Sequence, residues 1–218
     1  MDKQEQAIQF IKEKDYEQAA KLFIEHIDEH PNDSVGYINF GNLLEMMNQH
    51  EEAERFFLKA IELDEKAATA FVGLGNLYYK RKLFAEAEKM LRHALHLGIE
   101  DSEVYYLLGL VHFQKEEKML AIPFLQRASE LSDDIEKKFQ YGLALAQANY
   151  ADEAEKVLKE VVLKENSHAD ALYNLGIIMV HRDNLDEALY YFNQALAQDP
   201  GHKMAEDAKR NVLNMNER

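Results

Sequence analysis

Hydrophobic residues recur every three to four positions in all the longer segments of this chain, which is the spacing of one face of an α-helix. Residues 169–202 show the pattern clearly. An apolar face runs from Leu172 to Met179, a polar stretch at 182–184 interrupts it, and a second apolar face follows until Pro200. Because proline cannot continue a helix, this segment is predicted to be two helices joined by a turn and then ended.

The same two-helix unit recurs along the chain. A glycine sits inside an apolar helical segment at intervals of 34, 34, 33 and 34 residues, at Gly41, Gly75, Gly109, Gly142 and Gly176. An alanine follows each glycine position after twelve residues, at Ala19, Ala53, Ala87, Ala121, Ala154 and Ala188, with Ala7 at the glycine position of the first unit. The sequence therefore predicts an all-α chain of about six repeats, with approximate bounds 1–33, 34–67, 68–101, 102–134, 135–168 and 169–202, and a capping helix at 203–216.

The regular glycines need a physical reason, because a glycine inside a helix costs about 1 kcal/mol relative to alanine. Close approach of two helices would compensate this cost, and we expect Gly176 to face Ala188 across the pair. A single pair cannot bury both of its faces, so neighbouring pairs are expected to stack into one solenoid over residues 1–218. The segment from Ala128 to Gly142 is one residue shorter than the corresponding segments between other successive repeats. This predicts that repeats five and six are rotated relative to the first four.

Composition narrows the class of protein. There are only three prolines and nine glycines, no cysteine and no apolar run of membrane-spanning length, and the polar N-terminus is unlike a secretory signal. We therefore expect a cytoplasmic protein. The formal net charge of −15 disfavours nucleic acid and anionic membranes as partners. The excess acid is interpreted as a solvated outer face, and attraction of a basic partner is the alternative.

No motif for catalysis or cofactor binding is recognisable, so the chain is predicted not to be an enzyme and to use no cofactor. His26 with His30, and His93 with His96, have the helical spacing of metal ligands. His26 occupies a small-residue packing position, and the second pair has no third ligand nearby. We therefore predict no metal site.

The period of 34 with L-G-x-x-Y, A-x-x-x-F and a closing proline resembles the tetratricopeptide repeat (TPR) family, and nearly the whole chain shares the resemblance. It is similar in particular to the small stand-alone all-TPR proteins of Gram-positive bacteria. The resemblance implies an α-solenoid with a right-handed superhelical course. It also implies a protein-interaction module whose partner lies on the concave face.

The resemblance also indicates which first-helix residues line that concave groove. The candidate peptide-binding residues are Asn39, Asn42, Asn76, Tyr79, Lys80, Tyr106, Leu107, Leu110, Phe113, Phe139, Gln140, Leu143, Tyr173, Asn174 and Ile177. The basic cluster with which some family members grip a terminal carboxylate is not reproduced, because Lys12 and Lys80 are the only candidates. A receptor for chaperone tails is therefore not expected.

These residues predict a non-catalytic adaptor or scaffold that binds an extended or amphipathic segment of another protein. Asparagine amides would hold the peptide backbone, while apolar residues anchored on Phe113, Phe139 and Tyr173 would cover an apolar stretch. In the alternative, superhelical coiling buries these apolar residues within the chain. A further alternative is a structural subunit that self-associates and has no free peptide site, although a monomer is favoured.

Overall fold

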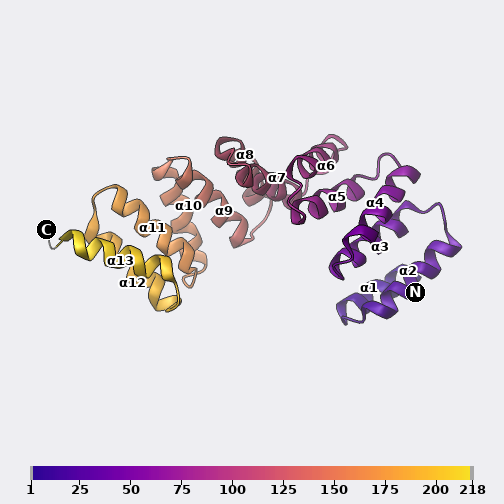
Figure 1. Ribbon diagram of the computed structural model, residues 1–218, viewed down its shortest axis with the longest axis horizontal. Coiled ribbons are helices and arrows are strands. Elements are labelled where there is room, and N and C mark those ends of the chain that lie inside the picture. Colours follow the sequence, from indigo (N-terminus) through magenta and orange to yellow (C-terminus); the bar gives the residue numbers. More distant parts are fainter. Residues whose placement is uncertain (1, 217–218) are drawn as a thin grey trace. The chain divides into compact units, whose positions relative to one another are not determined.

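The computed structural model describes residues 2–216, and all the regular elements in that range are α-helices (Figure 1). Their bounds are α1 Lys3–Lys12, α2 Tyr16–Glu29, α3 Ser34–Met46, α4 His50–Leu63, α5 Ala68–Lys80, α6 Phe84–His96, α7 Ser102–Gln114, α8 Lys118–Leu131, α9 Ile135–Gln147, α10 Ala151–Lys164, α11 Ala169–His181, α12 Leu185–Gln198 and α13 Lys203–Asn216. The predicted all-α helical-repeat fold is confirmed.

The helices form two compact units. Unit 1, residues 1–100, holds the pairs α1/α2, α3/α4 and α5/α6. Unit 2, from residue 101 onward, holds α7/α8, α9/α10, α11/α12 and the final α13. Each unit is described by itself below. That the repeats form one continuous solenoid stays a prediction.

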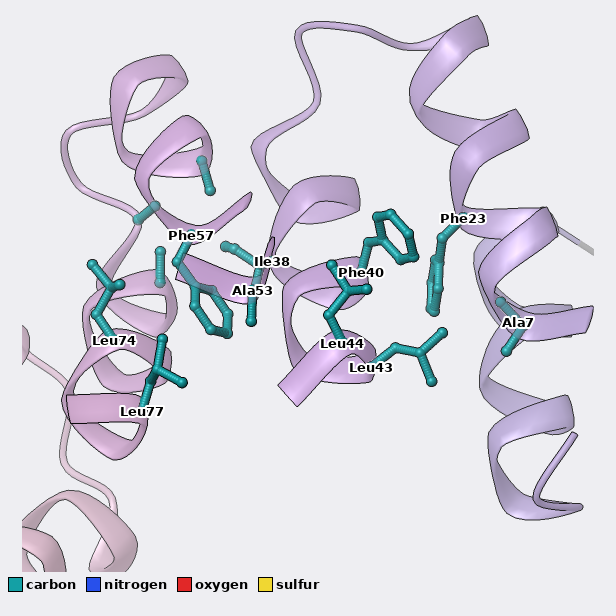
Figure 2. Close-up of a cluster of buried hydrophobic side chains, with 14 residues drawn as sticks. Ala7, Phe23, Ile38, Phe40, Leu43, Leu44, Ala53, Phe57, Leu74 and Leu77 are labelled. Atoms are coloured by element: carbon teal, nitrogen blue, oxygen red, sulfur yellow. The ribbon is translucent and has the colours of Figure 1, made fainter. Parts of the chain in front are cut away.

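Aromatic side chains fill the core of unit 1 between successive helices. Figure 2 shows Phe23 of α2 facing Phe40 of α3, and their ring centroids lie 6.3 Å apart. Phe57 of α4 is fully buried in the same cluster. The regular spacing of small residues explains the fit, because Ala19 and Ala53 are also fully buried and leave room for these rings.

The regular glycines allow close packing against a large side chain. A Cβ atom added to Gly176 would lie 2.4 Å from Cε1 of Phe192, and the three nearest atoms all belong to that ring. That Gly176 also faces Ala188 stays a prediction. Gly41, Gly75, Gly109 and Gly142 likewise meet the large residue sixteen positions later. Each glycine makes room for the side chain that fills the centre of its own helix pair.

Each helix pair is joined by a turn with one residue in the left-handed conformation. These residues are Lys14, Asn48, Lys82, Glu116, Asn149 and Asp183, with φ between 59° and 66°. None is glycine. Asn48, Asn149 and Asp183 are of types that adopt this conformation more readily than other residues, whereas the two lysines and the glutamate are not. Gly98, which follows the C-cap residue Leu97 of α6, is also left-handed, with φ of 92°.

Stacking within unit 2 is uneven at the place where one residue is missing. Helix α8 packs against α9 more extensively than the other helices of successive repeats pack within the described part of either unit. Leu125 of α8 and Ala144 of α9 share a buried cluster there. This agrees with the expectation of altered stacking, whereas the predicted rotation of repeats five and six stays a prediction.

Helix α13 covers the last repeat through one narrow face. Ala205 is fully buried and Val212 is 2% exposed. Met204 and Met215 of the same helix are 55% and 59% exposed. The capping helix thus shields α11 and α12 but leaves methionines on the surface.

Candidate functional site

The predicted groove residue Asn39 of α3 takes part in a polar network that links α3 to α1 within unit 1. Its amide nitrogen lies 2.6 Å from Gln4 Oε1, to which it donates. The Gln4 amide nitrogen lies 2.8 Å from Nε2 of the buried His26, which in turn lies 2.8 Å from Asp33 Oδ2. The His26 side chain therefore reaches the neighbouring repeat as its position predicted. Asn39 contributes to the packing of two repeats rather than standing free.

The remaining candidates of unit 1 form a mostly neutral surface. Asn42 is exposed and Asn76 is half-buried. The Lys80 ammonium forms an ion pair with the carboxylate of Glu45, one repeat earlier. Tyr79 is half-buried, and this burial raises the pKa of its hydroxyl. Amide groups are thus the polar atoms that unit 1 offers to a ligand at these positions.

In unit 2 most of the apolar candidates are half-buried, so one side packs on the core and the other meets solvent. They are Tyr106, Leu110, Phe113, Leu143, Tyr173 and Ile177. Two candidates differ from this expectation. Leu107 is 4% exposed and Phe139 is 6% exposed, and the Phe139 ring packs 4.4 Å from the His168 ring, centroid to centroid. Phe139 is a core residue and cannot anchor a partner in this conformation.

A cavity of about 400 Å³ opens between α9 and α11, beside the start of α10. Its lining residues are Ala146, Gln147, Asn149, Ala151, Asn174, Ile177, Ile178 and His181. Two predicted groove residues, Asn174 and Ile177, meet here. The Asn174 amide nitrogen donates to the backbone oxygen of Asp170 at 2.8 Å, which orients the side chain. Its Oδ1 has no partner among the described residues and is free to accept a hydrogen bond.

Carboxylates stand at the N-terminal ends of the first helices of unit 2. Glu103, Glu136 and Asp170 are the second residues of α7, α9 and α11. Each has one partner at or just before the start of the next of the helices α9, α11 and α13. Lys137 Nζ lies 3.2 Å from Glu103, His168 Nε2 lies 3.9 Å from Glu136, and His202 Nε2 lies 3.1 Å from Asp170, completing the three contacts.

The two histidines hold their positions through the helix starts. Nδ1 of His168 accepts from the backbone N–H of Ala171 at 3.2 Å, and Nδ1 of His202 accepts from that of Ala205 at 3.1 Å. With Nδ1 accepting, Nε2 carries the proton. His202 Nε2 can then donate to Asp170 Oδ1 at 3.1 Å, whereas the 3.9 Å between His168 Nε2 and Glu136 is too long for a hydrogen bond. This row of carboxylates was not among the predicted site residues, although its spacing of 33 and 34 residues is visible in the sequence.

Gln140 of α9 belongs to the same surface. It donates to Glu136 Oε1, one turn earlier, at 2.8 Å. Tyr106 lies below the Lys137 ammonium, which is 5.8 Å from the centre of its ring. Unit 2 therefore presents an acidic edge and, beside it, a half-exposed apolar surface that contains the α9–α11 cavity.

The family is decided by models of the tetratricopeptide repeat, which match residues 36–66, 72–134 and 139–203. The chain belongs to the tetratricopeptide repeat family. Proteins built from this repeat are in general non-catalytic interaction modules, so protein partners are the expected class. Within the described residues, we find no helix that is both long enough and apolar enough to cross a bilayer.

Three similar proteins illustrate the relationship. The crystal structure of YrrB, a TPR protein with an unusual peptide-binding site, is 40% identical, with a TM-score of 0.82 over 88% of this chain and 99% of that one. PilF of Pseudomonas aeruginosa has the same TM-score of 0.82 at 17% identity over 96% of both chains, which shows the fold alone. The human DnaJ homolog subfamily C member 7 is 29% identical over 101 residues, which are 46% of this chain but only 20% of that protein.

Proposed function

We propose that this TPR chain is a non-catalytic adaptor or scaffold that binds an extended or amphipathic peptide segment on the inner face of unit 2. The observation that carries the proposal is the α9–α11 cavity, where Asn174 and Ile177 meet. Its volume suits one or two apolar side chains rather than a whole folded domain. The likeness to YrrB supports the proposal, because that protein has a peptide-binding site and is 40% identical to this chain.

The chemistry of the cavity suits a peptide. The free Oδ1 of Asn174 accepts a backbone N–H, which any residue except proline supplies, so this contact does not depend on the peptide sequence. Ile177 and Ala146 offer an apolar wall for a side chain of the peptide. Leu143 and Tyr173 extend this wall as half-buried neighbours on α9 and α11.

The amides of Asn42, which is exposed, and of Asn76, which is half-buried, suggest a similar role in unit 1. Asn42 and Asn76 occupy the position in α3 and α5 that Ile177 occupies in α11. Both can donate to and accept from a peptide backbone. The apolar anchors, in contrast, belong to unit 2, so the main part of the binding energy is assigned to unit 2.

The proposal is tested by selecting from a display library of random twelve-residue peptides on the whole chain and measuring the affinity of the enriched peptides. Ile177→Ser and Asn174→Ala should each weaken binding by about tenfold, since each removes one central contact. Asn193→Ala, at an exposed position of α12, is the matched control and should leave affinity unchanged. Enrichment of no peptide, or of peptides insensitive to both changes, would refute the proposal.

Self-association is the second candidate, and one observation favours it. A cavity of about 470 Å³ lies against α12 and α13, lined in part by Leu196 and Leu213. The exposed Met204 and Met215 belong to the same final helix. Sedimentation across a range of concentrations tests this candidate, because self-association through this end predicts that Leu213→Lys shifts an oligomer to monomer.

A further inference from the structure

The inner face of unit 2 combines two chemically different strips. The first strip is acidic and consists of Glu103, Glu136 and Asp170. Their side chains are 53%, 53% and 56% exposed in spite of the contacts with Lys137, His168 and His202. The second strip consists of Leu110 and Leu143, together with Ile177. Solvent therefore reaches both strips, and a ligand on this face meets both.

The two strips are in register. Each carboxylate precedes an apolar residue of the same helix by seven positions, as Glu136 precedes Leu143 and Asp170 precedes Ile177. Seven residues are close to two helical turns, so both side chains leave the same face, about 10 Å apart along the axis. This separation is within reach of a Lys or Arg side chain that extends from a peptide lying over the apolar strip.

The negative charge of this edge is only partly balanced. The lysine beside it, Lys137, is 7% exposed. Its ammonium donates a hydrogen bond to Ser102 Oγ at 2.8 Å and forms an ion pair with Glu103. At the inner-face positions that α7, α9 and α11 share with these residues, the described chain carries no other Lys or Arg. The equivalent positions of α3 and α5 in unit 1 are Val35 and Thr69, so the acidic strip is a property of unit 2.

We infer that the segment bound by unit 2 carries lysine or arginine together with apolar residues. This inference rests on the proposed function and adds the charge of the partner. An acidic segment would be repelled by the strip, and a purely apolar one would leave the carboxylates under it without water or a counter-charge. A basic segment places its apolar side chains on Leu143 and Ile177 and its cations toward Glu136 and Asp170.

The spacing of the helices sets the spacing of the peptide residues. Packed helices lie about 8–10 Å apart, and an extended peptide advances about 3.3 Å per residue. One step from α9 to α11 therefore corresponds to about three peptide residues.

The experiment uses the twelve-residue display library with the whole chain as bait. The expected result is enrichment of peptides that contain Lys or Arg and apolar residues. Such a peptide should bind the triple variant Glu103→Gln, Glu136→Gln, Asp170→Asn about tenfold more weakly, because exposed ion pairs are individually weak but act together. A second variant with the same loss of charge, Glu51→Gln, Glu153→Gln, Asp186→Asn on exposed second-helix positions, should bind as the unaltered chain does.

The peptide itself supplies a test that does not depend on folding of the triple variant. Replacing each Lys or Arg of the selected peptide by Gln should weaken binding to the unaltered chain by a similar factor. Enriched peptides that lack basic residues, or that bind the triple variant equally well, overturn the inference. If such peptides still lose affinity with Ile177→Ser, the proposed function stands and only the charge of the partner is wrong; if no peptide depends on Ile177, the proposed function itself has failed.

Discussion

Substitution of Gly176 by alanine tests how the repeats are held together. A Cβ atom there would lie 2.4 Å, 2.7 Å and 3.0 Å from three ring atoms of Phe192, a fully buried side chain that has no room to move away. Alanine gains about 0.5–1 kcal/mol from helix propensity, whereas overpacking costs about 1–3 kcal/mol. The overpacking term is larger, so Gly176→Ala should lower the free energy of unfolding by about 0.5–2 kcal/mol.

The assay is urea unfolding followed by far-ultraviolet circular dichroism, in a double-mutant cycle with Phe192→Ala. Phe192→Ala alone should cost about 3–5 kcal/mol. In that background the obstacle is gone, so Gly176→Ala should now raise the free energy of unfolding by about 0.5–1 kcal/mol. This change of sign is the decisive observation.

Two further glycines serve as controls for the cycle. At Gly142 the nearest atom, Cδ2 of Leu158, lies 2.9 Å away, so Gly142→Ala should be less destabilising than Gly176→Ala. At the exposed Gly201 the nearest atom lies 3.4 Å away, and alanine there should change stability little. If Gly176→Ala stabilised the otherwise unaltered chain, or if its effect were the same in both backgrounds, the close-approach explanation of the glycines would be refuted.

Three other predictions concern stability, each measured by the same unfolding assay. Lys82→Gly should raise the free energy of unfolding by about 0.5–1 kcal/mol, because Lys82 has φ of 59°, whereas Asn48→Gly should gain less since asparagine tolerates that conformation; equal effects would contradict this. Phe139→Ala should cost about 3–5 kcal/mol because Phe139 is buried, and a change below 1 kcal/mol would instead restore it as an exposed anchor. A hydrogen bond from Lys159 lowers the pKa of Glu155 from 4.5, so the Glu155 carboxylate stabilises the fold above pH 4.5 and this stabilisation is lost as the pH falls through the lowered pKa. The Glu155→Gln variant should therefore lose less stability on acidification than the unaltered chain. An equal loss of stability at acid pH in both chains would contradict the assignment.

Much of the fold follows from the sequence because the same packing positions recur in every repeat. The alanines at fixed spacing, such as Ala53 and Ala188, are fully buried, as the spacing predicted. At the start of α3, Asp33 accepts from the backbone N–H of Val35 at 3.1 Å, as a capping residue of its type does. Local periodicity and capping depend on residues close in sequence, and the sequence displays them directly.

The candidate site was only partly predictable. The sequence placed Asn174 and Ile177 on the inner face, and both line the α9–α11 cavity. It also placed Phe139 there, and that residue is buried against His168. Position within a helix fixes the direction of a side chain, but the neighbouring repeat decides how much of it is covered.

The helical repeat, its period and its small-residue positions follow from the sequence alone, because they come from spacing within one helix pair. Packing of the helices then decided that each of the five regular glycines meets the large residue sixteen positions later and that Asn39 is hydrogen-bonded to Gln4. It also decided that the carboxylates near the starts of α7, α9 and α11 stay more than half exposed. These outcomes depend on contacts between side chains that are distant along the chain, and such contacts exist only once the helices have packed.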